Sequence, residues 1–185
     1  YSANLKGYLA ANIELDRGLA HLIQELEKSG ALDDTVIAVT SDHTPYYLTG
    51  DQLNQKSSID RNDKFDRNRG IFFIWNSEMK TGTKVEKYAM NIDVLPTLLN
   101  LIGYPYDSRL LMGKDILSNS EGLAILSDRS WINEYGRYDT SRQKFYPASD
   151  KVVGEQYVAM KNQEVAKMFQ ISSTMQYQDY YQYLF

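Results

Sequence analysis

The six residues Thr35 to Thr40 constrain the fold of this chain more than any other stretch. They carry no charge and are rich in β-branched side chains, and the run is too short for a helix. An unbroken apolar run of this length predicts a strand that is covered on both faces, as in a parallel sheet. We therefore expect an α/β architecture in which helices pack against both faces of a sheet.

The residues before this strand predict one long amphipathic helix from Ser2 to Ser29. Apolar side chains recur at steps of three and four residues along it and form a single stripe. Ser2 is placed to cap the start of the helix, and Gly30 to end it in a left-handed turn. A helix followed directly by a strand is the second half of a β-α-β unit. The missing first strand suggests that the chain is part of a longer protein.

A second strand and a second helix are expected further along. Gly70 to Trp75, "GIFFIW", is another buried-strand candidate. In "NIDVLPTLLNLIGYP", Pro96 must lie in the first helical turn, where its missing N–H does no harm. Asp93 then becomes the expected N-cap, and Gly103 the residue that ends the helix.

The last third of the chain predicts a hairpin and a further helix. Leu123 to Asn133 and Tyr135 to Phe145 resemble two strands around a turn at Glu134 to Gly136. Val153 to Ile171 has the pattern of a helix. The expected fold class is thus α/β, a doubly wound and mainly parallel sheet with an antiparallel edge hairpin and C-terminal helices.

Composition excludes several functions. The net charge of −4 argues against a nucleic-acid partner, because phosphate binding needs a basic face. The sequence has no cysteine, which excludes disulfides and thiolate chemistry, and only two histidines. No apolar run approaches the roughly 20 residues that cross a bilayer.

Asp42 and His43 follow the first predicted strand directly and are the candidate functional pair. Ligands in open α/β sheets bind beyond the carboxyl ends of the strands, where both side chains can converge after the backbone turns. A carboxylate oxygen and a neutral imidazole suit Zn²⁺ or Mn²⁺. The alternative is that Asp42 only caps a turn. A metal needs further ligands, and no second cluster stands out; His21 is expected to be a surface residue.

Residues Tyr46 to Arg69 are polar and irregular. They are interpreted as a solvated surface loop, with a lid or substrate-binding segment as the alternative, since a long loop lies beside the candidate pair.

Three stretches resemble the sulfatase and alkaline phosphatase superfamily, in the family's order. They are "ANIELDRGLAHLIQELEKSGALDDTVIAVTSDH", "NIDVLPTLLNLIGYP" and "LLMGKDIL". Together they lie within Asn4 to Leu117, about the first two thirds of the chain. Within the superfamily the sequence is most similar to the lipoteichoic-acid-synthase-like phosphoglycerol transferases, since "AILSDRSWINEYGRYD" resembles their edge hairpin.

The resemblance implies an enzyme on the extracytoplasmic face of a bacterial cell membrane, anchored by a segment upstream. It would transfer or hydrolyse a phosphate or sulfate ester, taken from a glycerophospholipid or a cell-envelope polymer. Asp42 and His43 match two of the family's metal ligands, for Mn²⁺ first and Ca²⁺, Mg²⁺ or Zn²⁺ otherwise. No stretch matches the nucleophile, so no catalytic residue is assigned in this chain. Residues 1–185 would form the C-terminal portion of one catalytic domain, with core units in 1–120 and the hairpin and terminal helices in 121–185.

One departure from the family and two alternatives remain. The family usually has Gly, or an aromatic residue and Gly, after Asp-His, whereas Thr44, Pro45 and Tyr46 follow here. The chain could instead be a non-catalytic interaction module, or belong to a phosphomutase-like branch. Alone, it is expected to be inactive. Without the N-terminal half its uncovered apolar surface is expected to drive homo-oligomer formation.

Overall fold

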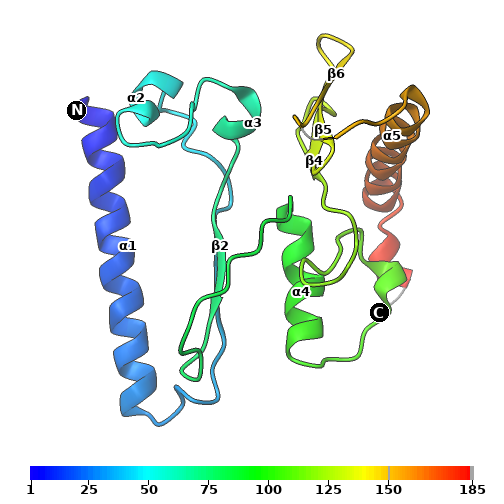
Figure 1. The fold of residues 1–185 in the computed structure, drawn as a ribbon. Coiled ribbons are helices and arrows are strands. Elements are labelled where there is room, and N and C mark those ends of the chain that lie inside the picture. The colour runs from blue at the N-terminus through cyan, green and yellow to red at the C-terminus, as the bar shows by residue number, and fades with distance from the viewer. Residues whose placement is uncertain (150, 184–185) are drawn as a thin grey trace. The chain divides into compact units, whose positions relative to one another are not determined.

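The computed structural model describes residues 1–149 and 151–183, and these form two compact units, Tyr1–Lys84 and Val85–Phe185. Figure 1 shows the elements of each unit along the chain. Within the described residues, no helix combines the length and the apolar character needed to span a membrane. That all 185 residues belong to one catalytic domain, divided near residue 120, stays a prediction.

Unit 1 begins with the predicted long helix, α1 (Ala3–Lys28). The Ser2 hydroxyl accepts a hydrogen bond from the Leu5 N–H at 3.2 Å, which confirms the expected N-cap. At the other end Gly30 has φ of +72°, and the Ala31 N–H donates to the Leu26 carbonyl at 2.9 Å. Both ends of the helix are therefore fixed by the residues that the sequence indicated.

The two predicted strands of unit 1 form, but they pair in the opposite sense to the one expected. β1 (Ile37–Thr40) and β2 (Phe72–Trp75) are antiparallel, with Ile37 opposite Trp75 and Thr40 opposite Phe72. The expectation of a parallel arrangement is wrong for this pair. A parallel partner requires a crossover that carries the chain back along the sheet. The segment between β1 and β2 holds only two short helices and returns the chain at the end where β1 stops.

Those helices are α2 (Gly50–Asn54) and α3 (Lys64–Arg67), and they order the segment that the sequence indicated as a surface loop. Thr49 begins α2 with a reciprocal capping box to Gln52. The Gln52 side chain also donates to the Ser2 hydroxyl at 3.0 Å, so α2 lies beside the start of α1 (Figure 1). The segment is therefore folded, with polar residues outside and two apolar residues, Leu48 and Phe65, buried.

Unit 2 consists of short helices, a four-stranded antiparallel sheet in the order β3-β4-β5-β6 and a long helix. The predicted turn around residues 134–136 is confirmed, since it joins β4 and β5. The two predicted strands are shorter than expected, because each range contains a further turn, and β3 and β6 pair with the two sides of the hairpin. Its elements are η1 (Asn91–Asp93), α4 (Val94–Leu101), η2 (Ser108–Leu110), β3 (Ala124–Ile125), β4 (Trp131–Asn133), β5 (Gly136–Asp139), β6 (Lys144–Pro147), α5 (Glu155–Tyr177) and η3 (Tyr180–Tyr183).

Trp131 is the centre of the core between this sheet and α5. Its side chain is fully buried and packs with the other buried core residues, Leu123 and Val165. The Tyr138 and Phe145 rings lie 6.0 and 5.6 Å from its ring. Its indole N–H donates to the Asn162 side chain at 2.7 Å, which satisfies the one polar group the indole buries.

Asp93 joins residues 91–105 to residues 110–117, the two segments of unit 2 that resemble the family. It stands at the N-cap position of α4 but makes no side-chain bond to that helix, which corrects the expected cap. Instead its carboxylate accepts the Met90 N–H and the Lys114 N–H, each at 2.7 Å. Burial raises the pKa of Asp93 above its usual range, and these hydrogen bonds oppose the rise. Gly113 allows this approach, because a Cβ there would lie 1.9 Å from the Ile92 carbonyl oxygen.

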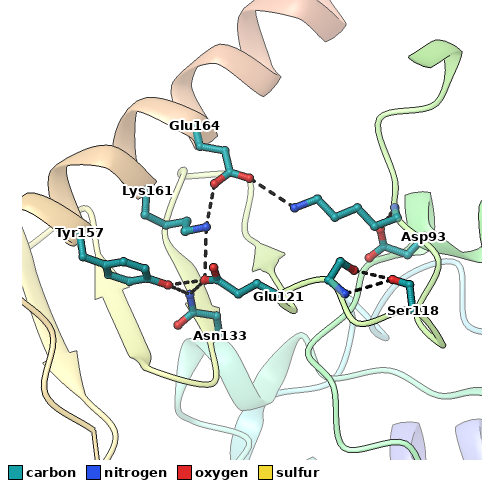
Figure 2. A network of polar contacts seen from close by, with 9 residues as sticks. Asp93, Ser118, Glu121, Asn133, Tyr157, Lys161 and Glu164 are labelled. Atoms are coloured by element: carbon teal, nitrogen blue, oxygen red, sulfur yellow. Dashed lines mark hydrogen bonds and ion pairs between the residues drawn. The ribbon is translucent and has the colours of Figure 1, made fainter. Parts of the chain in front are cut away.

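A polar network links α5 to the sheet, where Asn133 of β4 donates to Tyr157 and to Glu121 (Figure 2). Lys161, only 5% exposed, is bonded to Glu164 at 2.7 Å and to Glu121 at 3.2 Å. The Tyr157 hydroxyl also donates to Glu121, and Lys114 approaches Glu164 at 3.5 Å. Burial tends to raise the pKa of Glu164, but its bonds to the two lysines outweigh this, and the pKa lies below its usual value. The cluster therefore compensates its own charges.

The exposed stripe of α1 leads to a prediction of self-association. Leu15 and Leu22, seven residues apart on one face of α1, are 65% and 47% exposed, whereas Leu5 is buried. Exposed apolar surface of this kind favours association, so we expect the chain to form dimers or larger assemblies in light scattering. Leu15→Glu with Leu22→Glu should shift it toward monomer, and Arg17→Glu should not. A wild-type chain that stays monomeric at high concentration would contradict this expectation.

Lys161→Met tests the network. The change keeps most of the side-chain volume but leaves two carboxylates without their shared cation. Breaking a buried pair costs up to 3–5 kcal/mol, and since Glu121 and Glu164 are 29% and 35% exposed we expect about 2–3 kcal/mol less free energy of unfolding at pH 7. Lys167→Met, on the exposed side of the same helix, is the control and should change the free energy of unfolding by less than about 0.5 kcal/mol.

The same variant has a pH signature. The lowered pKa of Glu164 contributes stability that is present above its ordinary pKa of 4.5 and is lost as the pH falls through the lowered value. Without Lys161 the larger part of this contribution is lost and only that of Lys114 remains, so the variant should lose less stability than the wild type below pH 4.5 in denaturant titrations. If the free energy of unfolding falls equally in the two proteins below pH 4.5, the network does not act in this way.

Candidate functional site

The candidate pair lies directly beyond β1, where the pairing with β2 continues for one more residue. The Ser41 N–H donates to the Ile71 carbonyl at 3.2 Å, and the Ser41 hydroxyl accepts the Ile71 N–H at 3.4 Å. Gly70 leaves room for this hydroxyl, because a Cβ at residue 70 would lie 2.2 Å from it. The backbone is therefore fixed up to the residue that precedes Asp42.

Asp42 and His43 converge. One carboxylate oxygen of Asp42 accepts the His43 N–H at 2.7 Å, and the other lies 3.3 Å from the His43 Nε2. Their side chains are 85% and 48% exposed, so both are open to solvent. The turn after β1 thus brings two neighbouring side chains, which alternate along a strand, to one point.

Both ring nitrogens of His43 face acceptor oxygens. Nδ1 lies 2.8 Å from the Thr44 carbonyl oxygen, and Nε2 lies 3.3 Å from the Asp42 carboxylate. Neither oxygen can donate a hydrogen bond, so a cation bound at Nε2 would require the ring proton to be on Nδ1, where the Thr44 carbonyl accepts it. A metal-binding histidine usually binds the metal through one ring nitrogen and donates the N–H of the other to an acceptor such as a backbone carbonyl.

The spacing of the two donor atoms fits a shared divalent cation. Two ligands about 2.05 Å from a tetrahedral ion lie about 3.3 Å apart, and two adjacent ligands of an octahedral ion at about 2.1 Å lie about 3 Å apart. The observed 3.3 Å between the Asp42 oxygen and the His43 nitrogen lies close to both values. One oxygen and one imidazole nitrogen suit Mn²⁺ and Zn²⁺. Asp42 and His43 therefore fit a divalent cation, and their role as its ligands stays a prediction.

Other candidate ligands do not join this pair. Among residues 1–149 and 151–183, no group of three or more His, Cys, Asp or Glu side chains could hold a metal. His21 lies on α1 with its side chain 73% exposed, and its Nδ1 is 4.0 Å from Glu25, which confirms it as a surface residue. A metal bound by this pair would have two ligands here and would need further ligands from outside the described residues.

Unit 2 contains a cavity of about 150 Å³, but its charged groups already have partners. Lys114 and Glu164 line it and face one another, and the Asp93 carboxylate takes two backbone N–H groups. Met90, Met112 and Met168 also line it. We interpret this cavity as a packing feature of unit 2, which leaves the end of β1 as the candidate site.

Sequence reasoning missed one neighbour of the pair. The Tyr46 ring stacks on the His43 imidazole, with ring centroids 4.4 Å apart and planes at 12°. The signal was present as a departure from the family's pattern, since Thr44, Pro45 and Tyr46 stand where a glycine is usual. Sequence alone gave no way to place the tyrosine on the ring.

Known proteins match this chain in sequence. The family model described as Sulfatase matches residues 2–104. Lipoteichoic acid synthase of Staphylococcus saprophyticus is 34% identical over 163 residues, which is 80% of this chain and 24% of that protein. Lipoteichoic acid synthase 2 of Bacillus subtilis is 33% identical over 111 residues, covering 56% of this chain and 16% of that protein. The chain thus spans about a quarter or less of the length of these relatives.

A solved structure matches the fold. The lipoteichoic acid synthase LtaP of Listeria monocytogenes aligns with a TM-score of 0.67 at 24% identity, over 86% of this chain and 42% of that one. This likeness confirms the predicted α/β fold class, with its antiparallel strands and C-terminal helix. The family model covers more than half of the chain and includes the Asp42–His43 pair. The chain therefore belongs to the sulfatase family, and the relatives described here are lipoteichoic acid synthases.

Proposed function

We propose that this chain is the C-terminal part of the catalytic domain of a phosphoglycerol transferase that depends on a divalent metal. The observation that carries the proposal is the convergence of Asp42 and His43, whose donor atoms lie 3.3 Å apart at the open end of β1. The names of the relatives, which are synthases, favour group transfer over hydrolysis and a phosphate over a sulfate ester. The donor would be a glycerophospholipid and the acceptor a cell-envelope polymer, at the extracytoplasmic face of the membrane.

Each residue of the pair has a defined task in this proposal. Asp42 contributes a carboxylate oxygen, and its other oxygen holds the His43 backbone N–H, so the carboxylate cannot rotate freely. His43 contributes Nε2, with its ring proton on Nδ1, where the Thr44 carbonyl accepts it. A divalent cation held there, with Mn²⁺ as the first candidate, would neutralise charge on the phosphoryl oxygens and lower the pKa of a hydroxyl nucleophile. The nucleophile and the remaining ligands would come from the rest of the domain.

Substitution of the two ligands in the full-length protein tests the proposal. Loss of the groups around a ligand costs 10–100-fold in metal affinity, so loss of a ligand itself should cost more than about 100-fold. We expect this for Mn²⁺ binding by calorimetry with Asp42→Asn or His43→Ala, together with loss of phosphoglycerol transfer from a glycerophospholipid. His21→Ala, the other histidine, is the matched control and should keep both within about twofold. Variants of the pair that bind Mn²⁺ normally would refute the assignment, and the non-catalytic alternative would then stand.

The chain alone should not turn over substrate. Two ligands cannot hold a divalent ion firmly, because even structural and catalytic zinc sites use three or four protein ligands. We expect no release of diacylglycerol from a glycerophospholipid by residues 1–185, at any Mn²⁺ concentration, under conditions in which the full-length protein is active. A saturable rate that His43→Ala abolishes would show that the chain holds a complete site.

A further inference from the structure

The contact between His43 and Tyr46 is the most specific feature of the site that the family likeness does not explain. The two rings are nearly parallel, with planes at 12° and centroids 4.4 Å apart, which is the geometry of a stacked pair. Tyr46 is nevertheless 77% exposed. Packing around the tyrosine therefore does not account for its position, and the contact with the imidazole is what the ring gains there.

The backbone after His43 brings Tyr46 to this place. Pro45 has a restricted φ angle, and its carbonyl accepts the Leu48 N–H at 3.1 Å, which closes a turn around Tyr46 and Tyr47. Leu48 anchors the turn, since its side chain is 1% exposed. The Arg67 guanidinium donates to the Leu48 carbonyl at 2.6 Å and ties the turn to α3. The tyrosine is thus held over the imidazole by a turn with both a buried and a charged anchor.

The imidazole needs such support, because its own attachments are few. The side chain of His43 is 48% exposed, and its ring is held only at its two nitrogens, by the Thr44 carbonyl at Nδ1 and the Asp42 carboxylate 3.3 Å from Nε2. Both contacts lie at the edge of the ring, so neither restrains the ring against tilting out of its plane. A second ring stacked on its face removes this motion while Nε2 stays directed at Asp42.

We propose that Tyr46 is a positioning residue for His43, which pre-orients the imidazole so that Nε2 and the Asp42 carboxylate present one binding point before any cation arrives. The inference rests on the proposed function, because it assigns His43 as a ligand. In this view the Thr44–Pro45–Tyr46 sequence replaces the glycine turn usual in the family with a rigid turn that carries its own support for the ligand. The tyrosine hydroxyl has no part in this, so the ring alone should suffice.

The test uses the full-length protein and Mn²⁺ as the probe. A stacked pair of this kind is worth a factor of about 3–10 in an equilibrium constant, so Tyr46→Ala should weaken Mn²⁺ binding about 3–10-fold. Tyr46→Phe keeps the ring and should stay within about twofold of the wild type. Tyr47→Ala, at the neighbouring exposed tyrosine, is the matched control and should also stay within about twofold. Tyr46 is exposed, so the melting temperature should not change.

A second measurement needs neither metal nor activity. The ring protons of a histidine stacked on a tyrosine are shielded, so the His43 signals of the metal-free protein, assigned by their loss in His43→Gln, should lie upfield. Tyr46→Ala should move them downfield, and Tyr46→Phe should not.

The outcomes separate the two proposals. Unchanged Mn²⁺ affinity and unchanged His43 signals in Tyr46→Ala would overturn the role of the tyrosine. A raised KM for the phospholipid with unchanged Mn²⁺ affinity would overturn it too, and would make Tyr46 a substrate contact. If His43→Ala itself binds Mn²⁺ normally, the proposed function fails first, whatever Tyr46 does.

Discussion

The hydrogen-bonded end of β1 determines where the candidate site lies. The bond from the Ser41 N–H to the Ile71 carbonyl extends the pairing of β1 and β2 by one residue, and the chain turns only after it. Asp42 and His43 are therefore the first residues beyond a fixed backbone, and their donor atoms meet at 3.3 Å. Two neighbouring side chains can keep their donor atoms this close only if the backbone before them is held rigidly, as the strand holds it here.

Unit 2 contributes structure of a different kind. Asp93 accepts the N–H groups of Met90 and Lys114. The network around Lys161 ties α5 to the sheet through Asn133 of β4, which donates to Tyr157 and to Glu121. These groups are buried or half-buried, and each carboxylate has cationic or N–H partners. Buried charges that are fully compensated in this way hold elements in one arrangement and leave little capacity for a ligand. The contrast with the open, exposed Asp42–His43 pair is what separates scaffold from candidate site.

Local signals in the sequence predicted the elements well. Ser2, Gly30 and Gly103 mark helix ends because capping and left-handed turns depend on neighbouring residues alone, and Gly30 and Gly103 have φ of +72° and +68°. The position of Asp42 and His43 at a strand end also followed from local pattern. The sense of pairing between β1 and β2 did not, because it depends on how a segment of some thirty residues folds back. The hydrogen bond from the Lys114 N–H to the Asp93 carboxylate was not predicted for the same reason, because the two residues are distant in sequence.

The stack of Tyr46 on His43 is intermediate between the local features that the sequence predicted and the long-range contacts that it did not. It is local in sequence, yet it depends on a turn whose anchors, Leu48 and Arg67, come from a segment that looked like an open loop.

Crystals of the full-length protein soaked with Mn²⁺ and measured at the manganese absorption edge test whether Asp42 and His43 bind the metal. We expect an anomalous peak about 2.0–2.2 Å from both the Asp42 carboxylate oxygen and the His43 Nε2. A peak bound by other residues, with this pair left outside its coordination shell, would contradict this assignment.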